Sequence, residues 1–157
     1  MSGVWREINS IEFATFEECA AEYKKNYKLS PWIHDILREN SYEFDKTAFP
    51  IRLLRKKVAD FGFKGPTELH KIYREIETAG FQLVPPEIAI FSRKLYLDQP
   101  TGEWLRFATP LDAMIDSDGV PHLLKLGAAL GHHFIETYWA YKNAIFYPDN
   151  EFVVVEK

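Results

Sequence analysis

The stretch from Gly80 to Thr109 constrains the fold most, because helical patterns give way there to strand patterns. Gly80 follows a helical apolar stripe and suits the left-handed position that ends many helices. Pro85-Pro86 then begins a short helix. The turn Asp98-Gln-Pro-Thr-Gly102 leads into a strand from Trp104 to Thr109. The chain is therefore expected to be mainly helical before this junction and mainly β after it.

Capped helices are expected before the junction. Thr15 and Glu18 form a capping box, Ser30-Pro31 is an N-cap followed by a first-turn proline, and Gly65-Pro66 precedes a third helix. Their apolar stripes are Phe16-Cys19-Ala20-Tyr23, Trp32-Ile33-Ile36-Leu37 and Leu69-Ile72-Tyr73-Ile76. Arg93 and Lys94 lie near the end of the helix that follows Pro86, where cations complement the helix dipole.

Strands are expected after the junction. Asp118-Gly119 is a hairpin signal, residues 122–126 and 134–141 have strand character, and Glu151–Glu156 has the β-branched run of a buried strand. We therefore predict one α+β domain over residues 1–157. Short capped helices in a helical part, about 14–97, would pack against an antiparallel sheet in a strand-rich part, about 98–157.

Two segments fit more than one structure. Residues 51–61 match a helix through Ile51, Leu54, Val58 and Phe61, but they also show a short alternation typical of a strand. Between residues 120 and 145 a helical stripe competes with the strands, and glycines interrupt it. The helix or strand state of the first segment and the strand count in the second both stay open.

The charge pattern bears on possible partners. The net charge is −4, and residues 97–157 hold four Lys or Arg against nine Asp or Glu. This balance gives no electrostatic reason to expect nucleic acid, although the basic segment 52–57 keeps nucleic-acid binding as a second alternative. No apolar run is long enough to span a bilayer. Cys19 is the only cysteine and is expected to be a buried thiol, so we predict a cytoplasmic protein without a membrane partner.

Four stretches carry a resemblance. They are Leu83-x-Pro-Pro-Glu-Ile, Asp98-Gln-Pro-x-Gly-Glu-Trp-Leu, Asp116-Ser-Asp-Gly-x-Pro121 and Pro148-Asp-Asn-Glu-Phe-Val. Together they resemble a group of small uncharacterised prokaryotic proteins, from residue 58 to the end of the chain. The resemblance implies no activity, cofactor or catalytic residue.

A second set of residues could support metal or acid–base chemistry. Asp116 and Asp118 resemble the start of a calcium loop but lack its distal glutamate, so a hairpin turn explains them more simply. His132 and His133 are adjacent, and on a strand they would point to opposite faces. With His122 these residues define the first alternative, a small metal-dependent hydrolase with the site Asp116, Asp118, His122, His132 and His133.

The aromatic residues near the C-terminus support the preferred hypothesis. Trp139, Tyr141 and Tyr147 fall where a half-covered sheet would expose some of them, and exposed Trp and Tyr often anchor protein interfaces. No nucleophile elbow, paired cysteines or phosphate loop is present. We therefore predict a non-enzymatic protein-binding or regulatory module that presents these three residues to a protein partner and needs no cofactor.

Overall fold

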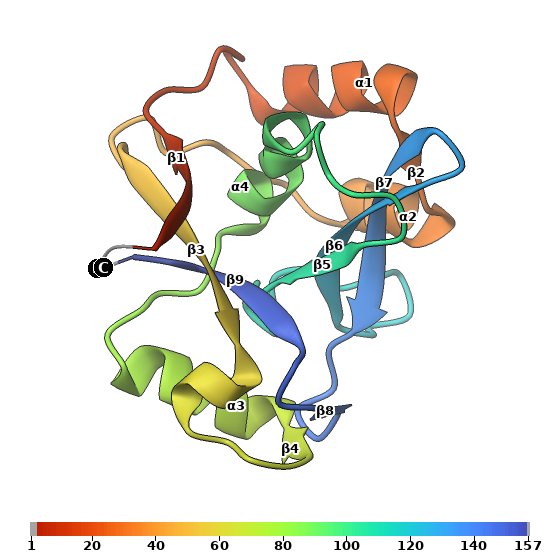
Figure 1. The fold of residues 1–157 in the computed structure, drawn as a ribbon. Coiled ribbons are helices and arrows are strands. Elements are labelled where there is room, and N and C mark those ends of the chain that lie inside the picture. Colours follow the sequence, from red (N-terminus) through yellow and green to blue (C-terminus); the bar gives the residue numbers. More distant parts are fainter. Residues whose placement is uncertain (1–2, 157) are drawn as a thin grey trace.

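The computed structural model describes residues 3–156 as a mixed sheet between layers of helices (Figure 1). The sheet has seven strands in the order β1-β3-β9-β5-β6-β7-β2. In that order they are β1 (Val4–Ile8), β3 (Ile51–Lys57), β9 (Glu151–Val155), β5 (Trp104–Phe107), β6 (His122–Ala129), β7 (His132–Trp139) and β2 (Lys28–Leu29). A separate pair joins β4 (Thr67–Glu68) to β8 (Ile145–Phe146). The predicted α+β class is confirmed.

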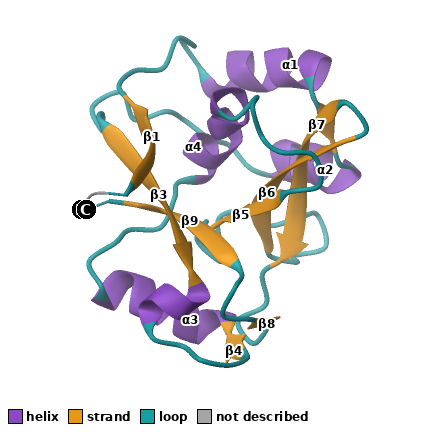
Figure 2. Ribbon diagram, in the orientation of Figure 1, coloured by secondary structure: helices purple, strands orange, loops and turns teal. Residues whose placement is uncertain are grey.

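The helices cover both faces of the sheet (Figure 2). They are α1 (Phe16–Asn26), α2 (Pro31–Glu39), α3 (Leu69–Thr78) and α4 (Pro86–Phe91), with 3-10 helices η1 (Val58–Phe61) and η2 (Ser92–Leu95). The expected caps are present, because Thr15 Oγ1 accepts from the Glu18 amide and Ser30 Oγ from the Ile33 amide, both at 3.2 Å. Gly80 has the left-handed φ of 92° expected at its helix end.

Strand β9 shows how the two core layers form. Val153 and Val155 pack into a cluster with α1, α2 and α4, whereas Phe152 and Val154 pack with α3 on the opposite face. Alternate side chains of a strand point to opposite faces, so a strand buried on both sides needs the continuous apolar run found here. The predicted terminal strand is confirmed.

The sheet differs from the expected one in two respects. The part expected to be helical, about 14–97, also supplies β2 and β3, and β3 lies between β1 and β9. The sheet is mixed rather than wholly antiparallel, because β5 runs parallel to β9 and β2 runs parallel to β7. Pairing between residues distant in the chain sets both features, and local patterns do not report such pairing.

The segment 51–61 is a strand followed by a single 3-10 turn. Leu53 contacts one core cluster, and Leu54, Val58 and Phe61 contact the other. The helical spacing of those last three residues therefore arises from a strand and a turn that bury apolar groups on one side. Pairing with β1 and β9 on both sides outweighs the helical pattern.

Residues 122–139 form one long antiparallel hairpin, β6–β7. Leu130 and Gly131 make its two-residue turn, with φ of 52° and 77°. Gly127, which seemed to interrupt a helix, lies beneath the Trp104 ring, and a Cβ added there would fall 2.0 Å from that ring. Two strands, β6 and β7, therefore lie between residues 120 and 145, and the short β8 begins at Ile145. No helix within residues 3–156 combines the length and the apolar character needed to cross a bilayer.

Candidate functional site

The predicted histidines lie at opposite ends of the β6–β7 hairpin. His122 pairs with Trp139 at one end, and Ala129 pairs with His132 at the turn. Seven residue steps separate these pairs, which corresponds to roughly 20 Å along a strand. Asp116 and His122 therefore lie at one end and His132 and His133 at the other, so the structure does not bring the five residues of the hydrolase alternative into one site.

Asp116 and His122 form a closed hydrogen-bonded pair. His122 Nε2 lies 2.8 Å from Asp116 Oδ2, and Nδ1 lies 3.0 Å from Thr137 Oγ1. The Asp116 and His122 side chains are each only 1% exposed. Asp116 Oδ1 also accepts from the amides of Asp118 and Val120, both at 2.9 Å. The Asp116–Gly119 turn is thus tied to β6 by a carboxylate that uses both of its oxygens.

The electrostatics of Asp116 follow from these contacts. Burial acts to raise the pKa of the Asp116 carboxyl, but the hydrogen bonds from His122 and from the two turn amides outweigh burial. The net result is a pKa below the ordinary aspartate value, so the carboxylate stays ionised at neutral pH. Both ring nitrogens of His122 and both oxygens of Asp116 therefore have partners within the chain, and both side chains are buried.

Aromatic rings cover the pair. Trp32 of α2 and Trp139 of β7 lie against the His122 ring with centroid separations of 5.4 and 4.9 Å. Trp32 also meets Trp139 edge-on at 5.4 Å, and Tyr141 stacks on Trp139 at 6.4 Å with an interplanar angle of 20°. We call Trp32, Trp139 and Tyr141 the aromatic surface. They remain 41%, 43% and 48% exposed.

The aromatic surface contains two of the three predicted partner-binding residues. Tyr147 is exposed as well, but it shares no ring contact with the other aromatics among the described residues. Sequence analysis assigned Trp32 only to the apolar face of its helix. Its position directly after Pro31, in the first turn, indicated that it could contact residues beyond its own helix. Side chains in the first turn can reach past the helix end.

The metal alternative gains no support from the geometry. Within residues 3–156, no three His, Cys, Asp or Glu side chains come together as possible metal ligands. Asp118 lies exposed in its turn, while Asp116 points inward to His122. His133 Nε2 instead lies 2.8 Å from the Leu97 carbonyl oxygen.

A polar pocket of about 380 Å³ occupies the turn end of the hairpin. The side chains of Lys24, Lys25, Lys28, His34, His132 and His133 line it, and we call it the basic pocket. The sequence pattern marked the two adjacent histidines as candidate site residues but did not mark the lysines. The lysines approach them because β2 pairs in parallel with the start of β7.

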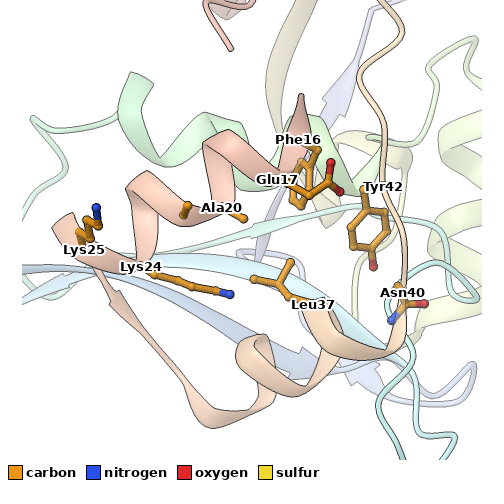
Figure 3. Close-up of a pocket in the computed structure, with 9 residues that line it drawn as sticks. Phe16, Glu17, Ala20, Lys24, Lys25, Leu37, Asn40 and Tyr42 are labelled. Carbon is orange, nitrogen blue, oxygen red and sulfur yellow. The ribbon is translucent and has the colours of Figure 1, made fainter. Parts of the chain in front are cut away.

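An apolar groove of about 420 Å³ lies beside the basic pocket, between α1 and the end of α2. Figure 3 shows Phe16 and Ala20 on α1 facing Leu37, Asn40 and Tyr42, with Lys24 extending along the groove toward Leu37. Lys24 and Lys25 line both hollows. The groove and the pocket are therefore neighbours along one edge of α1.

Both arginines of the basic segment 52–57 pair with carboxylates. Arg52 contacts Glu7 at 2.7 Å, and Arg55 contacts both Glu103 at 3.1 Å and Glu151 at 2.9 Å. Cations held in this way against carboxylates on neighbouring strands do not present a continuous positive surface. The nucleic-acid alternative has no supporting geometry at this segment.

Arg93 departs from its expected role. Instead of lying at the surface near a helix end, it is fully buried, and its Nη1 donates to the carbonyl oxygens of Gly127 and Phe134, each at 3.0 Å. The side chain thereby joins η2 to both strands of the hairpin. Sequence alone gave no reason to bury a cation at this position.

The comparisons with known proteins do not add a relative. No family model matches the chain, and neither the curated proteins nor the solved structures contain a match. The resemblance of the four stretches to small prokaryotic proteins therefore stays a prediction.

Proposed function

We propose that this protein is a non-enzymatic binding module whose aromatic surface receives a protein partner. The observation that carries the proposal is the stack of Trp32, Trp139 and Tyr141, which is exposed yet fixed on a buried foundation. Large rings that are already ordered lose little conformational entropy on binding, and Trp and Tyr are frequent interface hot spots.

The Asp116–His122 pair supports this proposal as a positioning element. Its hydrogen bonds fix the imidazole, and the imidazole in turn supports both tryptophan rings. The same contacts shield His122 from solvent, which disfavours acid–base catalysis, since a catalytic group must reach its substrate. A partner could bind directly to the exposed tryptophan rings. A substrate could reach His122 only if these rings moved away.

The surroundings of the aromatic surface define the chemistry of the partner. Asp35 lies one helical turn after Trp32 and accepts from the Ser117 amide at 2.8 Å, and that hydrogen bond lowers the pKa of its carboxyl. Asp118 lies exposed in the adjacent turn. Asp35 already pairs with Arg38 at 3.2 Å, whereas Asp118 forms no ion pair among the described residues. We therefore propose an apolar partner segment with a basic residue that lies beside Asp118. A cytoplasmic location belongs to the same proposal and is compatible with the free, buried thiol of Cys19.

Site-specific photocrosslinking tests this function. A benzophenone amino acid placed at Tyr141 should give a discrete adduct in the native host, and the adduct mass separates a second copy of this chain from a different protein. The same probe at Tyr147, which is exposed but outside the stack, is the matched control.

Substitution of the aromatic surface gives the decisive readout. Trp32→Ala with the probe at Tyr141 should reduce the adduct yield roughly tenfold, as expected for the loss of an interface hot spot. No adduct at Tyr141, or equal yields at Tyr141 and Tyr147, would contradict a partner site at this surface.

A further inference from the structure

The basic pocket is lined by cationic and imidazole groups without any carboxylate. Lys24 and Lys25 come from the end of α1, Lys28 from β2, His34 from α2, and His132 and His133 from the start of β7. No Asp or Glu contributes to the wall. In a chain of net charge −4 this is a local reversal of sign, and concave walls strengthen the potential inside.

The lysines of the pocket are not engaged elsewhere. In the part of the chain that the structure describes, Lys24, Lys25 and Lys28 form no ion pair, whereas Arg52, Arg55 and Lys94 each contact carboxylates. The C-terminal dipole of α1 accounts for Lys24 and Lys25 in its last turn. It does not account for Lys28 or for the three histidines, which lie on other elements.

A buried cation adds to the positive potential. Arg93 bonds to the Phe134 carbonyl, directly after His133, and within residues 3–156 it has no carboxylate partner. Burial lowers the pKa of Arg93 to about 10, which leaves the guanidinium charged at neutral pH. Because the interior screens charge weakly, this cation favours an anion in the adjoining pocket.

The polar groups of the pocket are held in place. His133 Nε2 donates to the Leu97 carbonyl oxygen at 2.8 Å, and the His133 ring meets the Tyr27 ring edge-on at 6.5 Å. Burial raises the pKa of Tyr27, so its hydroxyl stays protonated and remains a donor. The pocket therefore combines exposed ammonium groups with two oriented rings.

We propose that the basic pocket binds the phosphate group of a small phosphate monoester. A phosphate carries close to two charges and several acceptor oxygens, which suit a wall of ammonium and imidazole groups better than a single carboxylate does. The volume of about 380 Å³ leaves room for an organic group beside the phosphate, and the neighbouring apolar groove offers that group an apolar wall. This site is separate from the aromatic surface at the far end of the hairpin.

Titration followed by NMR of the histidine rings tests the proposal. Phenyl phosphate, inorganic phosphate and sodium chloride are added separately to the full chain at matched ionic strength. The rings of His132, His133 and His34 should shift saturably with phenyl phosphate, while His122, buried at the other end of the hairpin, should not. Tighter binding of phenyl phosphate than of phosphate supports an ester ligand, and equal binding supports the phosphate group itself as the ligand.

A charge-matched pair of variants makes the test specific. Lys24→Gln/Lys28→Gln should weaken phenyl phosphate binding roughly tenfold or more, because charge-assisted hydrogen bonds are lost. Lys57→Gln/Lys64→Gln removes the same charge from exposed lysines outside the pocket and should leave binding unchanged. All four lysines are exposed, so both variants should fold. The absence of saturable shifts with either phosphate compound, or equal weakening in the two variants, would overturn the proposal.

Discussion

The two ends of the β6–β7 hairpin use similar residues in opposite ways. At one end, His122 and Asp116 satisfy each other under two tryptophans, and the outer surface is aromatic. At the other end, His132 and His133 lie beside lysines at an open pocket. A histidine in sequence therefore does not distinguish a structural centre from a binding site. What distinguishes them is whether both imidazole nitrogens have partners within the described chain, as in His122, or only one, as in His133.

Removal of Asp116 should have the largest effect on this comparison. Asp116→Ala would leave His122 and the amides of Asp118 and Val120 without their buried acceptor, which should lower the free energy of unfolding by about 3 kcal/mol. Asp118→Ala, an exposed carboxylate two residues away, should change it by less than about 0.5 kcal/mol. Urea unfolding of both variants measures the difference, and similar values would show that the closed end is not a structural centre.

The ionisation of Asp116 predicts how stability depends on pH. Because its folded-state pKa lies below the ordinary value of about 3.9, its contribution is complete above about pH 5 and is lost as the pH falls through the folded-state pKa. Asp116→Asn keeps an oxygen for the turn amides but cannot titrate. Its unfolding free energy should therefore fall less steeply than that of the natural sequence below pH 4, as measured by denaturant titrations from pH 2 to pH 6. Equal slopes would assign acid unfolding to other carboxylates.

Chemical labelling should separate the open histidines from the closed one. Diethyl pyrocarbonate should modify the exposed His132 at least roughly tenfold faster than the buried His122, because His122 reacts only after local opening. Trp139→Ala should narrow this ratio by uncovering the imidazole, whereas Tyr147→Ala should not. Peptide mass spectrometry gives the rates. If His122 in the unsubstituted chain were labelled as fast as His132, the Asp116–His122 end would again be a candidate catalytic site.

The helices and strands were more predictable from the sequence than the candidate site was. The caps at Thr15 and Ser30, the helix end at Gly80 and the terminal strand follow from local chemistry, which is why they were predictable. The placement of β3 between β1 and β9 depends on pairing across about fifty residues with β1 and about a hundred residues with β9. Without knowledge of this long-range pairing, the sequence could not show that 51–57 is a strand. Nor could it show that the arginines of this segment pair with carboxylates elsewhere in the chain.

The same limit explains what was missed at each end of the hairpin. Trp139 and Tyr141 were predicted from their residue types, whereas Trp32 joins them only because α2 packs against β7. Lys28 reaches His132 and His133 only through the parallel pairing of β2 with β7. Arg93 shows the limit most clearly, since its partners are main-chain carbonyls of two strands that no side-chain pattern reports.

The smallest expected effect concerns Leu130 at the hairpin turn. Leu130 is 89% exposed and has a φ of 52°, a conformation that costs a leucine about 1 kcal/mol because its Cβ crowds the backbone. Leu130→Asn would create the Asn-Gly pair that turns of this kind prefer, and it should raise the unfolding free energy by about 1 kcal/mol. Leu97→Asn, also at an exposed leucine, should give no such gain.

If Leu130→Asn stabilises the chain and leaves phenyl phosphate binding intact, the basic pocket does not depend on the strained turn. A loss of binding would instead make Leu130 part of the open end, and a loss of stability would show that the leucine is not strained.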